Sequence, residues 1–359
     1  MHIKELLSLG LKHGRNSLAE WTYIHAGIDF TRPITFHALV NERCNCRCRH
    51  CEHWRMDKYT EEMSIEEWKK TLLSIKEFTG MYAINFSGGE PLIKKGFLEL
   101  LRFCADHDIH AGVTTNGMLL ERNASEIVAA RPFNLNISLD SHRAEIHDYI
   151  RGREGLFEKA LNGMKQLKEE QRQQNVTFPI IVKPTVMSLN FRTLPDIVDF
   201  AINAGASAVN FQPLGRWTTE TWEELWIEEK DWPELDRIME RLIMMKRKGA
   251  AIMNSEEVLG LMTGNFREEK ASPEHLPCRI GLHEFYIRPN GEVKLCFHFP
   301  SVGNTTKQAA REIWLGPEAR KIRDATLKCD KLCLLTCLSN KSLMHKANQA
   351  VTMLARQNQ

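Results

Sequence analysis

Short apolar runs alternate with longer stretches of helical periodicity between residues 34 and 212. The runs have the length of buried strands, and the stretches between them carry apolar residues at the spacing of one helix face. Ser64 and Glu67, for example, predict a capping box at the start of the first of these helices. The six predicted strands are Ile34–Val40, Tyr82–Ser87, His110–Thr115, Asn134–Leu139, Ile180–Val186 and Ala208–Gln212.

Six consecutive strand–helix units require parallel strands that are joined by right-handed crossovers. The sequence therefore predicts an α/β fold, built as an open sheet or as a barrel. Both architectures place their chemistry at the carboxyl ends of the strands, so the residues just after each predicted strand are the candidates for a functional site.

The pattern changes after residue 212. An amphipathic helix is predicted around Leu235–Lys248, and the acidic, mixed stretch Gly264–Pro277 predicts a linker. A β-hairpin follows, with strands at Glu284–Arg288 and Glu292–Phe297. The predicted divisions are an N-terminal extension at 1–33, a barrel core at 34–263, the linker at 264–277, a hairpin-plus-helix domain at 278–345 and a terminal helix or tail at 346–359.

Composition excludes several classes of protein. The 48 Lys and Arg residues nearly balance the 46 Asp and Glu residues, and the net charge of +2 argues against a protein built mainly to bind nucleic acid or an anionic membrane. No apolar run approaches the roughly 18 residues of a membrane span. The first residues also lack the apolar stretch of a signal peptide. We therefore expect a soluble, cytoplasmic protein of 359 residues with no membrane span and no nucleic-acid partner.

The cysteines form two groups, one after the first predicted strand and one in the last quarter of the chain. Closely spaced cysteines pair poorly with one another as disulfides, and nothing in the sequence signals export. Short loops that hold several sulfurs are typical of metal and iron–sulfur sites. The first group is Cys44, Cys46, Cys48 and Cys51, the second is Cys278, Cys296, Cys329, Cys333 and Cys337, and Cys104 stands alone on a predicted helix.

Cys44, Cys48 and Cys51 form a C-x3-C-x2-C set. Three thiolates on a four-iron cluster leave one iron without a protein ligand, and an open position distinguishes catalytic metal sites from structural ones. With this spacing the sequence resembles the radical S-adenosylmethionine (radical SAM) superfamily. The resemblance implies a partial (β/α)6 barrel of the TIM type, a [4Fe–4S] cluster on these cysteines, and S-adenosyl-L-methionine (SAM) on the open iron. In that family, reductive cleavage of SAM yields a 5′-deoxyadenosyl radical that abstracts a hydrogen atom.

Residues after the other predicted strands extend the resemblance. Ser87-Gly88-Gly89-Glu90 matches the family's GGE motif, in which glycines allow close backbone approach and the carboxylate accepts the amino group of SAM. The remaining matches imply contacts with SAM, and the position of His50 is the family's usual aromatic position beside the adenine. These other matching residues are Thr115, Asn116, Ser138, Asp140, Arg151, Pro213 and Leu214.

The second cysteine group resembles the SPASM or twitch type of C-terminal domain, which binds auxiliary iron–sulfur clusters. Five cysteines are too few for the two clusters of a full SPASM domain, so the resemblance implies a twitch-like domain with one auxiliary [4Fe–4S] cluster. A zinc site is the alternative, since thiolates also suit zinc. Cys278 and Cys296 are expected ligands, together with two of Cys329, Cys333 and Cys337. We favour the last two, because their i, i+4 spacing would place them on one helix face.

Each group holds one cysteine more than its cluster needs. If Cys329 is free, it would be a candidate hydrogen donor to a substrate radical, as cysteines are in radical SAM epimerases. We favour the alternative, in which Cys329 is a spare buried thiol or another cluster ligand. Cys46 would block SAM if it bound the fourth iron, so we expect it to stay unligated.

The resemblance implies an enzyme that abstracts hydrogen from an organic substrate and takes its electron from a donor such as flavodoxin or ferredoxin. We favour a small molecule of the natural-product type, which would undergo oxidation, epimerisation or formation of a carbon–carbon or carbon–heteroatom bond. Only 33 residues precede the first predicted strand, too few for a peptide-recognition domain. Maturation of a ribosomally made peptide is the alternative. A non-enzymatic electron carrier or zinc scaffold would explain the cysteines but not Gly88-Gly89-Glu90.

The role of Cys46 can be tested by single substitutions. Cys44→Ala, Cys48→Ala and Cys51→Ala should each abolish the cleavage of SAM, because each removes a cluster ligand, whereas Cys46→Ala should retain it. The measurement is 5′-deoxyadenosine formed from SAM under a strong reductant by anaerobically reconstituted protein. Loss of 5′-deoxyadenosine in Cys46→Ala alone would overturn the ligand assignment.

Overall fold

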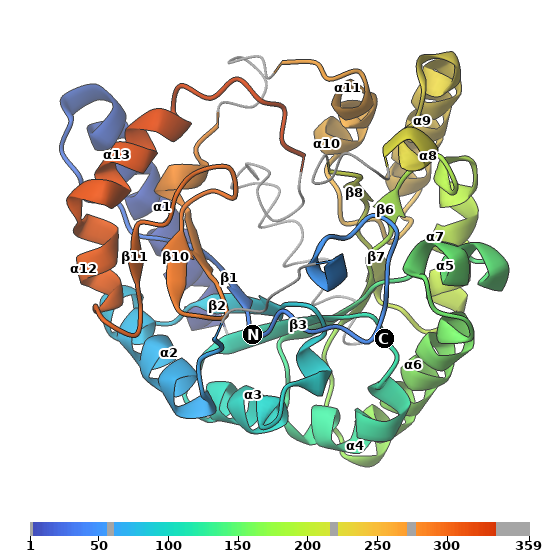
Figure 1. Ribbon diagram of the computed structural model, residues 1–359, viewed down its shortest axis with the longest axis horizontal. Coiled ribbons are helices and arrows are strands. Elements are labelled where there is room, and N and C mark those ends of the chain that lie inside the picture. Colours follow the sequence, from blue (N-terminus) through green and yellow to red (C-terminus); the bar gives the residue numbers. More distant parts are fainter. Residues whose placement is uncertain (1–2, 56–60, 216–221, 271–277, 335–359) are drawn as a thin grey trace.

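The computed structural model describes residues 3–55, 61–215, 222–270 and 278–334. Figure 1 shows a curved row of strands with helices along its outer side, which is the arrangement of a partial TIM-type barrel. The predicted α/β class is therefore confirmed. In the main sheet the order of the barrel strands is β1-β2-β3-β4-β5-β7, and each neighbouring pair is parallel.

All six predicted strands are present, but the last two are interrupted. Pro184 has no N–H to donate, so the ladder breaks there and resumes as the short pair β6–β8. The strands are β1 (Thr35–Leu39), β2 (Ala83–Ser87), β3 (His110–Thr115), β4 (Asn134–Ile137), β5 (Ile180–Val182), β6 (Thr185–Val186), β7 (Ala208–Val209) and β8 (Gln212–Pro213).

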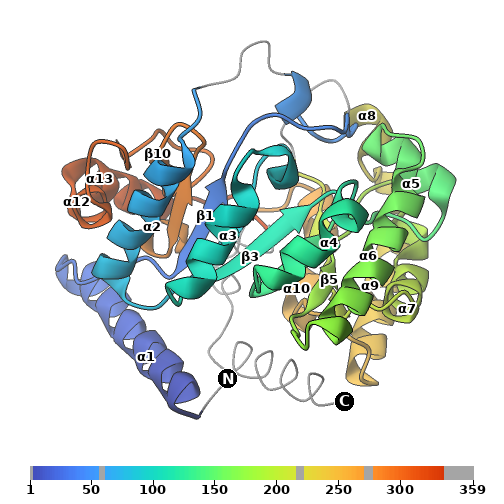
Figure 2. The same cartoon turned by 90° about the horizontal axis from the view of Figure 1, so that it is seen from below.

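Helices connect the strands and cover the outer face of the sheet, as Figure 2 shows from a second direction. The predicted capping box is confirmed, since the Ser64 hydroxyl accepts from the N–H of Glu67 while the Glu67 carboxylate accepts from the N–H of Ser64. The helices of the barrel region are α2 (Ile65–Thr79), α3 (Phe97–Asp106), α4 (Leu120–Ala129), α5 (Ala144–Arg151), α6 (Leu156–Gln173), α7 (Leu194–Asn203), α8 (Trp222–Leu225), α9 (Trp232–Arg247), α10 (Glu256–Gly260) and α11 (Met262–Phe266).

The predicted C-terminal hairpin forms and also joins the barrel. β9 (Glu284–Ile287) and β10 (Glu292–Lys294) are antiparallel, and β11 (Gly303–Asn304) extends them. β9 also pairs in parallel with β1, with Phe36 opposite Phe285. The segment that carries the second cysteine group is therefore continuous with the sheet that carries the first. The hydrophobic pattern did not predict this pairing, because the paired residues Phe36 and Phe285 lie 249 positions apart in the chain.

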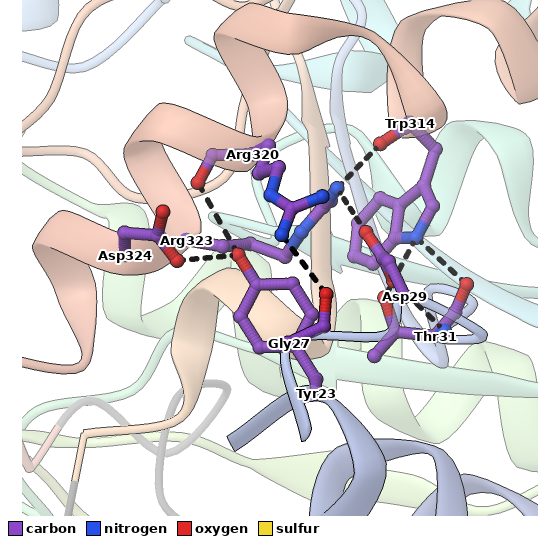
Figure 3. Close-up of polar contacts among 8 residues, drawn as sticks. All are labelled: Tyr23, Gly27, Asp29, Thr31, Trp314, Arg320, Arg323 and Asp324. Atoms are coloured by element: carbon purple, nitrogen blue, oxygen red, sulfur yellow. Dashed lines mark hydrogen bonds and ion pairs between the residues drawn. The ribbon is translucent and has the colours of Figure 1, made fainter. Parts of the chain in front are cut away.

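The N-terminal extension contains a helix, α1 (Ile3–Ala26), whose last turns contact α13 (Pro317–Thr326). The helix α12 (Ala310–Leu315) directly precedes α13. Polar contacts of two α1 side chains fix this position. The Tyr23 hydroxyl donates to Asp324 at 2.6 Å, as Figure 3 shows, and the Glu20 carboxylate binds both His283 and Arg279. The N-terminal helix is therefore bound to the C-terminal region of the chain.

The stretch predicted as a linker, 264–277, begins within a helix. The helix α11 occupies the first residues of the stretch predicted as a linker, while 271–277 lie outside the described residues, as does the predicted tail. Cys104 lies on a helix, as predicted, and is fully buried there in α3. No helix in the described ranges has the length and apolar character that crossing a bilayer requires.

The helices α4 and α6 pack closely because a glycine lies at their contact. A Cβ on Gly163 of α6 would lie 2.4 Å from Cβ of Leu120 at the start of α4. Neither backbone can yield without moving its helix, so the absence of a side chain at 163 sets the distance between them.

Gly163→Ala should lower the midpoint of chemical unfolding, because overpacking costs about 1–3 kcal/mol and exceeds the roughly 1 kcal/mol gained in helix propensity. Gly260→Ala in α10 is the matched control, since its Cβ would meet no atom within 4 Å and it should unfold at the same midpoint or higher. Both midpoints can be followed by circular dichroism in denaturant. If the two variants were stabilised equally, the α4–α6 contact would have room for a methyl group at position 163, and the explanation by overpacking would be wrong.

Candidate functional site

The first cysteine group lies in a loop just after the carboxyl end of β1. Cys46 and Cys48 are buried against Leu156, and Cys44 and Cys51 pack on the same small cluster. The loop is tied down at one side by the N–H of Arg49, which donates to the carbonyl of Ile150 at 2.9 Å. Gly152 allows this approach, because a Cβ there would lie 2.2 Å from the carbonyl oxygen of Arg47. All four thiols are thus gathered at one point of the fold.

The hydrogen bonds within this loop distinguish Cys44 from Cys46. The side chain and the backbone N–H of Cys46 both bond to the Cys44 sulfur, and they lower the pKa of the Cys44 thiol to about 6. The same contact, together with burial, raises the pKa of Cys46. Burial raises the pKa of Cys48 to about 12, although the nearby Arg151 guanidinium opposes this. Cys44 is therefore the thiol of the group that most readily becomes a thiolate.

The GGE segment packs directly on the start of the cysteine loop. A Cβ on Gly88 would lie 2.4 Å from Oδ1 of Asn41, and one on Gly89 would lie 2.0 Å from the carbonyl oxygen of Arg43. The N–H of Gly89 donates to the carbonyl of Asn41 at 3.0 Å. The two glycines are thus needed for backbone-to-backbone contact, and the contact positions the chain that leads to Cys44.

Glu90 is 1% exposed, and its carboxylate accepts three hydrogen bonds. The Thr115 hydroxyl donates at 2.8 Å, the N–H of Asn116 at 2.8 Å and the N–H of Leu92 at 3.1 Å. Burial raises the pKa of Glu90 to about 7, because it outweighs these donors. A buried carboxylate at this pKa would be stabilised in its ionised form by an incoming ammonium group.

Asn116 connects the end of β3 to the cysteine loop. Its side-chain amide donates to Oδ1 of Asn45 at 2.7 Å and lies 3.8 Å from the sulfur of Cys44. Its backbone N–H is one of the donors to Glu90. One residue therefore touches both the predicted cluster ligand and the predicted ligand of the SAM amino group.

A buried ion pair supports the loop from the other side. Arg151, at the end of α5, contacts Asp140 at 2.6 Å, and its Nη1 lies 3.9 Å from the sulfur of Cys48. Burial alone would raise the pKa of Asp140, but the Arg151 charge and nearby histidines outweigh it and the pKa is lowered. Asp140 is fully buried and also accepts the N–H of Thr185 at 2.9 Å. The pair places a guanidinium beside a predicted cluster ligand.

Several residues that support this pair were not predicted. The imidazole of His147 accepts the N–H of Asp140, and burial lowers the pKa of His147 to about 4. The Asn190 amide donates to the carbonyl of Asp140 at 2.8 Å. Asn41 similarly donates to the carbonyl of Glu90 at 2.8 Å. The signal available for Asn41 was its place just after a strand, whereas Asn190 lies between elements where no pattern singles it out.

The remaining predicted residues lie at or just beyond the carboxyl ends of strands. Ser87 ends β2, and Ser138 follows β4 and donates its N–H to Thr115. His50 is half-buried in the cysteine loop, and burial lowers its pKa to about 4. Pro213 and Leu214 are joined to β6 rather than to the cysteine loop, through the pairing of Pro213 with Val186 and the N–H of Leu214. Their contacts with SAM remain predictions.

The second cysteine group is also gathered in space. Four of its thiols lie near enough for their charges to interact: Cys278, Cys296, Cys329 and Cys333. Burial, and to a smaller extent repulsion from the three neighbouring thiols, raises the pKa of Cys333 to about 11. Cys329 belongs to this set, while Cys337 lies outside the described residues. The chain at Cys333 is irregular up to residue 334, and the helical face proposed for Cys333 and Cys337 extends beyond the described residues.

Two buried carboxylates connect the hairpin to the barrel, and neither was predicted. Glu284 of β9 contacts Nδ1 of His37 on β1 at 2.6 Å. Arg288, at the end of the hairpin's first strand, binds Glu42 just beyond β1 at 3.1 Å. Polar residues within otherwise apolar strands were the available signal for Glu284 and His37.

Comparison with known proteins identifies the family. A model of the radical SAM superfamily matches residues 39–201, and a model described as an iron–sulfur cluster-binding domain, SPASM, matches residues 278–338. The first match contains Cys44, Cys48 and Cys51, and the second contains the whole later group. The chain belongs to the radical SAM superfamily.

Two curated relatives and one solved structure illustrate the similarity. Fe-coproporphyrin III synthase of Methanosarcina barkeri is 30% identical over 67% of this chain and 59% of that protein. PqqA peptide cyclase of Bradyrhizobium diazoefficiens is 27% identical over 49% of this chain and 45% of its own length, so the chain spans less than two thirds of both. SuiB of Streptococcus suis bound to precursor peptide SuiA has the same fold, with a TM-score of 0.64 at 16% identity over 82% of this chain and 67% of that one.

The donor sets fit the cofactors of a radical SAM enzyme with a SPASM domain: a [4Fe–4S] cluster, SAM and auxiliary iron–sulfur clusters. Within the described ranges, no three Cys, His, Asp or Glu side chains converge to hold a single metal ion. The ligands of an iron–sulfur cluster bind different iron atoms, so they need not converge on one point. Loops rich in thiols and poor in carboxylates suit iron–sulfur ligation.

The raised pKa of Glu90 predicts a specific pH dependence of stability. The unfolded chain ionises this group near 4.5 and the folded chain near 7, so the folded state holds the extra proton between these values. The free energy of unfolding of the cluster-free protein should therefore fall as the pH rises through this window, by on the order of 3 kcal/mol from this group.

Glu90→Gln cannot titrate and should flatten this dependence, measured by denaturant titrations at several pH values under reducing conditions. Glu66→Gln, on the exposed face of α2, is the matched control and should keep the wild-type dependence. If Glu90→Gln retained the full slope, another group would be responsible for it.

Proposed function

We propose that the protein reductively cleaves SAM and uses the product to abstract hydrogen from an organic substrate. The observation that carries this proposal is the convergence of three strand ends on one loop. Cys44, Glu90 and Asn116 are linked by direct contacts, and Arg151 closes the other side against Cys48. Radical SAM chemistry requires a cluster ligand loop and a site for the SAM amino group to be adjacent, and these contacts support that arrangement.

The chain's own residues would each have a distinct part. Cys44, Cys48 and Cys51 would hold the [4Fe–4S] cluster, which supplies the electron that cleaves SAM to methionine and a 5′-deoxyadenosyl radical. Glu90 would orient the amino group of SAM, since its buried carboxylate is bonded to Asn116, which also contacts Cys44. Burial of Cys46 and Cys48 with Leu156 would keep water from the cluster.

Arg151 would act on the cluster through its charge. A guanidinium near a cluster thiolate stabilises the more negative, reduced state, so Arg151 would raise the potential of the cluster. Asp140, which is fully buried against Arg151, would be a positioning residue for that charge. Cys278, Cys296, Cys329, Cys333 and Cys337 would supply the ligands of the auxiliary cluster, with the set of four still open.

For the substrate we propose a ribosomally made peptide. A relative named as a peptide cyclase and a solved structure of the same fold bound to its precursor peptide support this class. A small molecule is the second candidate, supported by the relative named as a synthase of Fe-coproporphyrin III. The expectation of a small molecule rested on the short segment before β1, and the comparisons do not confirm it.

The decisive experiment uses anaerobically reconstituted protein. We expect about eight iron atoms per chain, as two [4Fe–4S] clusters require, and 5′-deoxyadenosine formed from SAM under a strong reductant. The triple variant Cys44→Ala/Cys48→Ala/Cys51→Ala should keep about half of the iron and form no 5′-deoxyadenosine. Absence of 5′-deoxyadenosine from fully loaded, reducible wild-type protein would contradict the proposed activity.

Co-expression with short peptides encoded near the gene, followed by mass spectrometry, tests the substrate class. A mass change that requires Cys44 would support the peptide proposal. If 5′-deoxyadenosine forms but no peptide is altered and a small-molecule extract stimulates turnover, the peptide proposal is wrong and the second candidate stands.

A further inference from the structure

The outer side of the cysteine loop is rich in arginine. Between positions 43 and 55 the chain holds four arginines against one glutamate, a net charge of +3 with histidine neutral, whereas the whole chain carries only +2. Arg47 is exposed. Arg153 is also exposed, and it follows the glycine that packs on the backbone of Arg47. Figure 2 shows this loop at the upper edge of the molecule, beside α5 and α8. Positive charge is therefore concentrated on the surface just outside the thiols.

Trp54 connects this charged surface to a predicted cluster ligand. Its indole N–H donates to the carbonyl of Cys48 at 2.9 Å. The guanidinium groups of Arg47 and Arg55 lie 5.9 and 4.8 Å from the centre of the Trp54 ring. An aromatic ring carries no net charge, so these cation–π contacts hold the two guanidinium groups without neutralising them. An aromatic ring flanked by two cations thus lies one hydrogen bond away from the backbone of Cys48.

The charges of Arg47 and Arg153 are not neutralised within the part of the chain that the structure describes. No carboxylate in the described ranges lies within ion-pair distance of either guanidinium, and the exposed Glu52 and Glu154 are bound to neither. Arg49 differs from them, since it lies 3.4 Å from a carboxylate of α8. The cations beside Trp54 are therefore available to carboxylates of another molecule.

We propose that the surface formed by Arg47, Trp54, Arg55 and Arg153, which we call the Arg47 surface, docks an acidic protein that donates single electrons. The inference rests on the proposed function, because reductive cleavage of SAM requires one electron to reach the cluster of the first cysteine group. Electron transfer weakens steeply with distance, so the donor must bind close to this loop. Carboxylates on the donor would complement the arginines, and tryptophan and arginine are the residues that protein interfaces favour at their centres.

The exchange needs only a brief encounter. The donor, a reduced flavin or iron–sulfur protein, loses one electron and the cluster gains it, while no covalent bond forms or breaks and no proton is transferred. Complexes of this kind are small, burying less than about 1,200 Å². Charge complementarity brings such partners together quickly and makes the encounter sensitive to salt. Three cations around one aromatic ring are sufficient for a contact of this size.

An acidic peptide substrate suits the Arg47 surface less well. The hydrogen atom to be abstracted must lie close to SAM, which is predicted to bind at Glu90 and Asn116, and both of these side chains are buried. Arg47 and Arg153 are exposed on the outside of the loop. A substrate would have to pass around the loop to touch both places, whereas an electron donor never has to enter the barrel.

The test compares a protein reductant with a small one on the anaerobically reconstituted enzyme. Fully reduced flavodoxin, an acidic protein, and dithionite would each drive formation of 5′-deoxyadenosine from SAM, and binding of oxidised flavodoxin would be measured separately by isothermal titration calorimetry. Arg47→Glu/Arg153→Glu should weaken flavodoxin binding by about tenfold or more, and added salt should weaken binding to the wild-type enzyme. With dithionite this variant should match the wild-type rate, because a small reductant needs no docking surface.

Arg237→Glu/Arg241→Glu is the matched control. Both arginines are exposed on α9, and the substitutions change the net charge by the same amount, so this variant should bind flavodoxin as the wild-type enzyme does. Arg47→Lys/Arg153→Lys keeps the charge and should retain most of the binding. Iron content and circular dichroism melting establish that each variant is folded and loaded.

The outcomes separate this inference from the proposed function. Absence of 5′-deoxyadenosine with either reductant would contradict the proposed function, and the binding measurement would still decide the docking surface. A wild-type enzyme that responds to dithionite but does not bind flavodoxin would overturn the docking surface alone. Wild-type binding by Arg47→Glu/Arg153→Glu, or an equal loss in the control variant, would also overturn it. So would loss of the dithionite-driven reaction in Arg47→Glu/Arg153→Glu at full iron content, because the arginines would then act on the cluster site itself.

Discussion

The buried carboxylate of Glu90 holds together the strand ends on which the whole site depends. It accepts from the residues that follow β3, while its own backbone is bonded to Asn41 and Arg43, which follow β1. The cysteine loop starts at that point, so its conformation is set by contacts with two neighbouring strands. A carboxylate is suited to this task because it accepts several N–H groups at once, and burial keeps those bonds from competing with water. The cost is a raised pKa, which an ammonium ligand would offset.

The other side of the loop relies on charge rather than on a neutral network. Asp140 and Arg151 satisfy each other in a site from which water is excluded, and the guanidinium still reaches the sulfur of Cys48. A buried pair of this kind adds little net stability, because both ions lose their hydration. Its value lies in fixing a positive charge beside a thiol. The two supports are chemically different, and they meet only through the cysteine loop.

Much of this arrangement could be predicted because it depends on short, local sequence patterns. The six strands follow from short apolar runs, and Cys44, Gly89 and Glu90 stand at strand ends where spacing identifies them. The remainder depends on pairs far apart in the chain. No local pattern predicts that Phe36 pairs with Phe285, and none predicts that Asp140 forms an ion pair with Arg151. The splitting of the fifth strand had a visible cause in Pro184. The N-terminal helix, in contrast, is held by Arg279, His283 and Asp324, which lie 259 to 301 positions later than their partners.

The parallel pairing of β9 with β1 gives the hairpin a second role, which is to cover the edge of the barrel sheet. β1 would otherwise be the outermost strand of the barrel sheet, with unpaired N–H and C=O groups along one side. Exposed strand edges of this kind recruit strands from other molecules. A shortened chain that ended before residue 278 would keep every motif of the SAM site. Its strand β1, however, would have an unpaired edge close to the thiols of the cysteine loop. Gene truncation or proteolysis at that point would therefore yield aggregates rather than a smaller working enzyme.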